Sequence, residues 1–321
     1  MATTGPSTET MRGWAINGYG GEIVLMDDLP VPAPGPRDVL IRMRSAEVGI
    51  WDELVRTGAC NVARSFPLVL GLGGAGTIAA VGAQVEGFAK DQYVYAYNYP
   101  LADNGSWAEY MLVPDSYVAR VPTSIALMEA GGLPIAGLSA YEALIDLLGV
   151  KEDEIVLVSA GAGGVGHLAV QIASLFGARV GATASRRNRD FLADLGAEAV
   201  IDYTDEDDLA KAILAVFPGG VDKVLNCVRG EDANDYVWAL KEGGKMVDLT
   251  GSVSVDRPGV EIISHHVVRG NGARLAELAR LVDDGALQVA LHDIVPFADA
   301  QDALDEVLTG HVRGKVVLRI M

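Results

Sequence analysis

Cysteine and histidine are scarce in this chain of 321 residues. Its two cysteines, Cys60 and Cys227, cannot build a disulfide framework or a four-thiolate zinc site. Of the five histidines, His265 and His266 are adjacent, and the other three are scattered without the spacing of metal ligands. The composition therefore excludes a disulfide scaffold and indicates no metal site.

Long apolar runs and an excess of positive charge are missing as well. No apolar run reaches the roughly twenty residues that are needed to cross a membrane. Residues 1–10 are polar and lack a signal-peptide core, so we expect a disordered tail and a cytoplasmic protein without a membrane partner. A net charge of −18 disfavours nucleic acid as a partner. Because 50% of the residues are hydrophobic, the chain can form two sizeable cores.

A glycine motif within residues 155–166 is the strongest functional signal in the sequence. The apolar run IVLV is followed by Gly161, Gly163 and Gly166 in the pattern GxGxxG, and a helical pattern starts at once. In a dinucleotide site the first glycine permits a tight turn, the second admits the pyrophosphate, and the third lets the helix pack on the strand. The phosphates would bind N–H groups that begin the helix, those of Gly163, Gly164 and Val165. A glycine-rich turn that binds nothing is the alternative.

The end of the next predicted strand, 178–183, carries the residues that select the cofactor. An NAD site places Asp or Glu there to bind the ribose 2′-hydroxyl. This chain has Ala184 at that position, followed by Ser185, Arg186 and Arg187. A hydroxyl and two guanidinium groups suit a 2′-phosphate, so we predict NADPH rather than NADH as the cofactor. The alternative is that these arginines are the solvated start of a helix.

Three regions of different pattern follow one another along the chain. Residues 1–122 contain short β-type runs broken by Pro and Gly, which predict a partly open β-barrel or sandwich. Residues 123–268 alternate strands and helices, which is the pattern of a Rossmann-type α/β domain with a doubly wound parallel sheet. Residues 269–321 are too few for a core of their own, so we expect them to return and complete the first domain.

Motifs along nearly the whole chain share their order with one known family. They are LVLGLGGAGTIAAVG, GSWAEYMLVP, LPIAGLSAYEAL, VSAGAGGVGHLAVQIASLFGARV, GAEAVIDY and HVRGKVVL. In this the chain resembles the medium-chain dehydrogenase/reductase superfamily, specifically its zinc-free quinone oxidoreductase branch. The resemblance implies a GroES-like catalytic domain, a nicotinamide cofactor and a homodimer that pairs edge strands, here at 265–270.

The resemblance also identifies the positions at which zinc-dependent members of the superfamily hold their metal. Their cysteine ligand aligns with Gly49, and their His-Glu pair aligns with Leu72 and Gly73. None of these side chains can coordinate a metal. His167 is expected to flank the cofactor helix instead. We therefore predict no metal ligand in this chain, and the chemistry would proceed without a metal Lewis acid.

Without zinc, reduction of an already electrophilic small molecule, such as a quinone or an α,β-unsaturated carbonyl, is the favoured reaction. The protein needs only to position the reactants, exclude water and supply hydrogen-bond donors. Trp51 would make the substrate pocket apolar, and Tyr97 would donate a proton unless strand alternation places its hydroxyl in water. Asp52 is retained from the family pattern, either as a general acid or as a structural hydrogen-bond partner.

Further cofactor contacts are implied by the resemblance alone. They are Ser139 beside the nicotinamide, Tyr203 near the adenosine phosphate, Cys227 and Val228 at the ribose, Thr250 and Gly251 beside the nicotinamide, and Lys315 reaching from the C-terminal segment. Two of these residues have an alternative explanation. Cys227 could instead be a buried apolar filler, and Lys315 could instead be a surface charge.

Other enzyme classes lack their signatures in this sequence. No tyrosine has lysine four residues later, as a short-chain dehydrogenase requires, and GLSAY lacks the second glycine of a hydrolase nucleophile elbow. A non-catalytic NADPH-binding protein of the same fold and a zinc-free alcohol dehydrogenase-like enzyme remain as alternatives.

Overall fold

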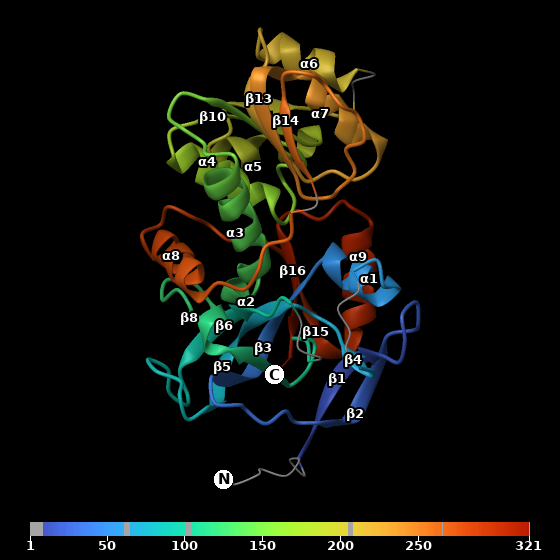
Figure 1. The fold of residues 1–321 in the computed structure, drawn as a ribbon, viewed down its shortest axis with the longest axis vertical. Helices are drawn as coiled ribbons and strands as arrows, with labels where there is room; N and C mark the ends of the chain where they lie inside the picture. Colours follow the sequence, from blue (N-terminus) through green and yellow to red (C-terminus); the bar gives the residue numbers. More distant parts are fainter. Residues whose placement is uncertain (1–8, 61–64, 101–103, 205–207, 265, 321) are drawn as a thin grey trace. The chain divides into compact units, whose positions relative to one another are not determined.

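The computed structural model describes residues 9–60, 65–100, 104–204, 208–264 and 266–320. The chain divides into two compact units, one built from residues 1–138 and 269–321 and the other from residues 139–268 (Figure 1). The tail expected over residues 1–10 lies outside the described residues up to position 8, and Thr10 already begins the first strand.

The first unit contains a seven-stranded sheet and a three-stranded sheet, which confirms the predicted β-rich, GroES-like architecture. The larger sheet has the order β15-β16-β3-β5-β6-β8, with β7 paired to β3, and the smaller has the order β2-β1-β4. The strands are β1 (Thr10–Ile16), β2 (Val24–Pro30), β3 (Asp38–Val48), β4 (Leu68–Val69), β5 (Gly73–Val81), β6 (Tyr93–Tyr97), β7 (Tyr110–Pro114), β8 (Val118–Arg120), β15 (Leu291–Pro296) and β16 (Lys315–Arg319).

Several helices belong to this unit. They are α1 (Ile50–Thr57), α2 (Leu127–Gly131), the start of α3 (Pro134–Tyr141), α8 (Gly272–Asp283), α9 (Ala300–Leu308) and the short 3₁₀ helices η1 (Asp115–Tyr117) and η5 (Phe297–Asp299).

The C-terminal segment joins the sheet because β16 pairs antiparallel with β3, with Val317 opposite Glu47. The pairing brings Lys315 close to the carboxyl end of β3.

The first unit extends to Leu138, whereas we predicted the second domain from residue 123. The reason is close packing of α2 and α3 on this unit. A Cβ on Gly131 would lie 2.1 Å from Ser45 Oγ on β3. The N–H of Ile135 donates to Glu47 Oε2 over 3.1 Å. Helical residues before position 139 therefore complete the core of the first unit.

The second unit has one six-stranded sheet of order β11-β10-β9-β12-β13-β14. All of its pairs are parallel, which confirms the predicted Rossmann-like α/β fold. Its strands are β9 (Ile155–Val158), β10 (Arg179–Thr183), β11 (Ala199–Ile201), β12 (Val221–Asn226), β13 (Leu240–Asp248) and β14 (Glu261–Ser264). Its helices are the π-helix η2 (Glu142–Leu147), α4 (Gly166–Leu175), η3 (Arg186–Asn188), α5 (Arg189–Asp194), α6 (Leu209–Val216), η4 (Glu231–Asn234) and α7 (Asp235–Trp238).

The edge of this sheet lies earlier in the sequence than we predicted. The expected edge strand was 265–270, but the edge strand is β14, which ends at Ser264 opposite Asp248 of β13. Residue 265 lies outside the described residues, and residues 266–270 form no strand. The pairing stops there because β13 itself ends at Asp248.

Candidate active site

The glycine loop connects β9 to α4 and has the close packing of a dinucleotide-binding turn. Its left-handed residue is Ala160, with φ 48°, so the tight turn does not depend on Gly161 as the motif suggested. Gly161 is needed for a different reason, because a Cβ there would lie 2.8 Å from Ala182 Cβ on β10. A Cβ on Gly166 would lie 2.2 Å from the carbonyl oxygen of Ala160, so the third glycine does let the helix approach the strand end.

Gly163 differs from its two neighbours in the motif. A Cβ there would meet only Ala160 O, at 3.2 Å, so there is space above this residue. His167 is fully buried and its Nδ1 lies 2.9 Å from Gly163 O, which fixes the loop from the first turn of α4. Among the residues that the structure describes, the N–H groups of Gly164 and Val165 have no hydrogen-bond partner. Free N–H groups beside open space at a helix start fit the pyrophosphate of a nicotinamide dinucleotide.

The residues that were predicted to select the cofactor follow β10 directly. Ser185 is half-buried and precedes η3, whereas Arg186 and Arg187 are exposed. Arg186 has a partner that the sequence analysis missed, because its N–H donates to Asp202 Oδ2 over 3.0 Å and its Nε lies 3.7 Å from the same oxygen. Tyr203, the next residue, is also exposed, so these polar groups gather at the ends of β10 and β11.

A buried polar network joins the carboxyl ends of β9, β12 and β13. Asp248 accepts hydrogen bonds from Asn226 Nδ2 at 2.9 Å, from Thr250 N at 3.0 Å and Oγ1 at 2.8 Å, and from Val253 N at 2.9 Å. Ser159 Oγ donates to Asn226 Oδ1 over 2.8 Å. Ser159, Asn226 and Asp248 were absent from our predicted site, although the sequence signal was present: each polar residue ends or directly follows a buried parallel strand.

This network holds the loops that carry four of the predicted cofactor contacts. The N–H of Cys227 donates to Ser159 Oγ over 2.7 Å, and the Val228 carbonyl accepts from Thr250 Oγ1 over 3.0 Å. Gly251 follows in a left-handed conformation, with φ 67°. Burial raises the pKa of the Cys227 thiol to about 12, which keeps it neutral at physiological pH. Cys227 itself is half-buried beside this polar network.

Asp52 is buried in the first turn of α1 and uses both carboxylate oxygens to hold backbone. Oδ2 accepts from Gly49 N over 2.9 Å, and Oδ1 accepts from Gly71 N over 3.1 Å. Burial raises the pKa of Asp52 to about 7, against the lowering effect of these hydrogen bonds and of the nearby Lys315. This geometry favours the structural alternative for Asp52 over a general acid.

Lys315 is buried, so its interpretation as a surface charge is wrong. Its Nζ lies 2.7 Å from Glu47 Oε1 and donates to the Val48 carbonyl over 3.1 Å. Glu47 is fully buried, and burial raises the pKa of its carboxyl although Lys315 acts to lower it. The sequence analysis missed Glu47, because 267 residues separate Lys315 from the end of β3.

Tyr97 is 1% exposed at the end of β6, so the alternative of a hydroxyl in water is wrong for this residue. Burial raises the pKa of Tyr97 well above its ordinary value, and its ring stacks on Tyr99 with centroids 6.1 Å apart. Tyr95 is also buried and donates its hydroxyl hydrogen to Leu275 O over 2.5 Å, so this hydrogen already has a backbone acceptor. Trp51 is half-buried in α1. Ser139, which begins the second unit, is buried in α3.

Comparison with known proteins agrees with this geometry. The family model for the alcohol dehydrogenase GroES-like domain matches residues 35–123, and that for zinc-binding dehydrogenase matches residues 195–318. The 2-methylene-furan-3-one reductase of Solanum lycopersicum is 35% identical over 96% of this chain and 79% of its own length. The chain belongs to the medium-chain dehydrogenase/reductase superfamily. It falls in the quinone oxidoreductase-like branch, as its motifs indicated.

Two further members are similar to this chain. The chloroplastic NADPH-dependent alkenal/one oxidoreductase of Arabidopsis thaliana is 34% identical over 96% of this chain and 79% of its own length. The solved structure of the quinone oxidoreductase from Coxiella burnetii is 28% identical and superposes with a TM-score of 0.84, covering 98% of this chain and all of the other.

The metal named in one family model does not fit this member of the superfamily. Gly49 precedes α1, Leu72 is buried, and Gly73 begins β5, so the three positions offer no donor atom from a side chain. The described residues also contain no group of three or more His, Cys, Asp or Glu side chains with the arrangement of metal ligands. The residues at these three positions therefore do not fit a zinc ion.

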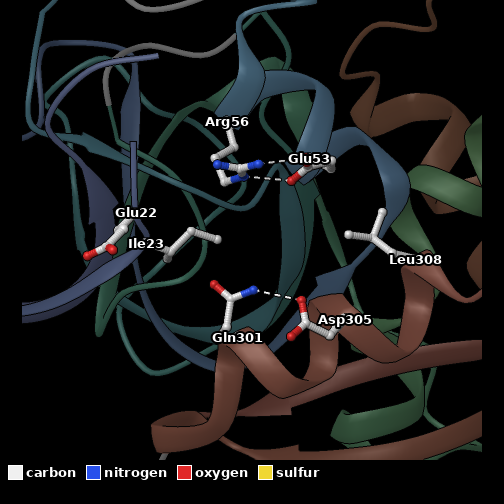
Figure 2. Close-up of a pocket in the computed structure, with 7 residues that line it drawn as sticks. All are labelled: Glu22, Ile23, Glu53, Arg56, Gln301, Asp305 and Leu308. Carbon is white, nitrogen blue, oxygen red and sulfur yellow. Dashed lines mark hydrogen bonds and ion pairs between the residues drawn. The ribbon is translucent and has the colours of Figure 1, made fainter. Parts of the chain in front are cut away.

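A pocket of about 420 Å³ lies on the first unit, between the loop after β1 and the helices α1 and α9 (Figure 2). It contains none of the predicted catalytic residues. Two of its carboxylates are engaged, because Glu53 binds Arg56 through both oxygens and Asp305 accepts from Gln301 over 2.8 Å. The pocket is therefore lined by polar side chains that already pair with one another, and Gly49 is not among its lining residues.

In the part of the chain that the structure describes, no helix is both long enough and apolar enough to cross a membrane.

Proposed function

We propose that this chain is a zinc-independent, NADPH-dependent reductase that transfers hydride to a quinone or an α,β-unsaturated carbonyl. The observation that carries the proposal is the residue chemistry at Gly49, Leu72 and Gly73, which provides no metal to activate an alcohol. An acceptor that is already electrophilic needs no such activation. Relatives named as alkenal/one and 2-methylene-furan-3-one reductases align with 96% of the chain, which supports this acceptor class.

The bound nicotinamide would supply a hydride from C4, and the protein would supply position and electrostatics. The glycine loop and the Asp248 network would orient the dinucleotide. The side chains around Gly49 would bind the acceptor and exclude water.

Oxidation of NADPH, followed by absorbance with a panel of quinones, enones and enoyl thioesters, tests the proposal. We expect turnover of at least one class, unchanged by exhaustive chelation. A Gly163→Val variant is the matched control, because its side chain would fill the space above the loop and block the cofactor. Binding of NADPH without turnover of any acceptor would favour the non-catalytic alternative.

The preference for NADPH is expected to depend on Arg186 and Arg187. Replacing both with Ala should raise the Kd for NADPH about 100-fold, because charge-assisted hydrogen bonds contribute about 1.5–3 kcal/mol each. NADH lacks the 2′-phosphate, so its Kd should change less than about threefold. Fluorescence titration measures both constants, with Arg189→Ala as the control at a neighbouring exposed arginine. Equal losses for the two cofactors would refute the assignment.

We further propose a homodimer that pairs the edge strands β14 of two copies. Parallel sheets leave an unpaired edge there, and a second copy would satisfy it. Sedimentation that finds only monomer at micromolar concentration would contradict this. A cytoplasmic location stays a prediction from the sequence.

A further inference from the structure

The Lys315 ammonium lies beside Gly49 and has one N–H left over. It carries three N–H donors, of which one points to Glu47 Oε1 at 2.7 Å and another to the Val48 carbonyl at 3.1 Å. Within the described residues, the third has no partner. Only 8% of Lys315 is exposed, and a buried donor without an acceptor is costly. The ammonium is therefore ready to bind an acceptor atom that the protein does not provide.

The space next to this ammonium exists because residue 49 is glycine. Its backbone is extended, with φ −153°, so glycine is not required there by the chain conformation. A Cβ on Gly49 would meet only Lys315 Nζ at 3.8 Å and Trp51 N at 4.0 Å. The N–H of Trp51, in the first turn of α1, also has no partner among the described residues, because Gly49 has no side chain to cap it.

Two unrelated donors thus meet over one glycine. One is a buried cation from the C-terminal strand β16, and the other is a helix-start N–H, where the helix dipole favours negative charge. Both donor nitrogens lie within 4.0 Å of the Cβ position of Gly49, and two donors near one point suit an oxygen atom that becomes negative during reaction. Glu47 positions the cation, because its second oxygen is fixed by Ile135 N at 3.1 Å.

We propose that Lys315 is a catalytic residue whose ammonium, with the Trp51 N–H, binds the carbonyl oxygen of the acceptor over Gly49. The inference rests on the proposed reductase function. The β carbon of the acceptor gains a hydride with its electron pair, the C=C pair shifts to the bond between the α and carbonyl carbons, and the carbonyl pair moves to oxygen. Lys315 and Trp51 stabilise that oxyanion. The α carbon then takes a proton from solvent and the carbonyl reforms. The two electrons that reduce the acceptor come from the nicotinamide, which is thereby oxidised.

Two single variants test the oxyanion site by enone reduction. Lys315→Met should lower kcat/KM about 100-fold, since loss of one oxyanion donor costs about 10²–10³ in rate. Gly49→Ala should lower it about tenfold by covering the third N–H, while its Cβ makes only ordinary contacts and leaves the melting temperature unchanged. Lys241→Met is the matched control, because Lys241 also pairs with a carboxylate, Asp222, at 3.0 Å.

The Kd for NADPH separates this proposal from a cofactor contact by Lys315. We expect it to stay within about twofold of wild type in both variants. A Lys315→Met variant with a tenfold weaker NADPH Kd and full kcat would overturn the proposal, as would a Gly49→Ala variant with wild-type kcat/KM. If Lys315→Met unfolds because Glu47 is left unpaired, the double variant Glu47→Leu with Lys315→Met replaces it, with the same expected loss.

A titration without turnover distinguishes failure of the oxyanion site from failure of the proposed function. Wild-type protein should lower the apparent pKa of bound 4-nitrophenol by about one unit, because the phenolate oxygen resembles the reacting oxygen. Gly49→Ala should abolish this absorbance shift. A wild-type protein that produces no shift contradicts the oxyanion site even if enones are reduced, and a shift without reduction of any acceptor contradicts only the reductase function.

Discussion

Replacing Asp52 with Ala is expected to lower the free energy of unfolding by about 2–5 kcal/mol at pH 6, because it leaves one buried and one half-buried N–H group unsatisfied. These belong to Gly49 and to Gly71, which follows Asp52 by 19 residues in the sequence. Denaturant unfolding measures the loss. Glu53→Ala, one residue later on α1, removes only a partly exposed pair with Arg56 and should cost less than about 1 kcal/mol.

The stability that Asp52 contributes should depend on pH in an unusual direction. Burial raises the pKa of its carboxyl to about 7 in the folded protein, above an unfolded value near 3.9. The folded state therefore binds the proton more tightly, so this contribution is full below about pH 4 and is lost as pH rises through about 7. The stability difference between wild type and Asp52→Ala should shrink from pH 6 to pH 8. A difference that grows over this range would show that the carboxyl pKa is not raised.

Replacing Asp248 with Ala is expected to cost about 2–5 kcal/mol as well, because four hydrogen bonds end on this buried carboxylate. The loops that carry Val228 and Thr250 would lose their common anchor, so we also expect the Kd for NADPH to rise about tenfold or more. Unfolding and cofactor titration check the two effects. Asp256→Ala, an exposed residue in the loop after β13, is the control.

The pH dependence at Asp248 should have the opposite sign to that at Asp52. Burial raises the pKa of Asp248, but the hydrogen bonds from Val253, Asn226 and Thr250 outweigh it and hold the pKa below its ordinary value. Its contribution is therefore present above the unfolded pKa and is lost as pH falls through the lower folded value. Between pH 7 and pH 3 the wild type should lose more stability than Asp248→Ala; equal losses would contradict the assignment.

The sequence was sufficient to predict the elements that depend on local pattern. The run from Ile155 to Gly166 combines a buried strand, a glycine loop and the start of a helix. The conformation of each element depends on residues close to it in the sequence, so the local pattern predicts it. The sequence was also sufficient to predict that the zinc positions of the superfamily bind no metal here. Glycine and leucine side chains have no donor atoms whatever their surroundings. One detail of this loop differed from the prediction, because the left-handed residue of the turn is Ala160 and not Gly161.

Contacts between distant segments were beyond the sequence. Nothing near Lys315 indicates that Glu47 is its partner, because the pairing depends on the register of β16 with β3. The role of Asp52 was ambiguous because its second partner, Gly71, lies on another segment. Strand alternation failed for Tyr97 because every residue of β6 after Tyr93 is buried, and the stacking of Tyr97 on Tyr99 could not be read from the sequence.

Reduction of an enone with NADPH deuterated at C4 tests the central claim most directly. With metal removed by exhaustive chelation, we expect full activity and deuterium on the carbon β to the carbonyl, with a solvent proton on the α carbon. Deuterium on a carbinol carbon, or activity that chelation abolishes and zinc restores, would contradict the account.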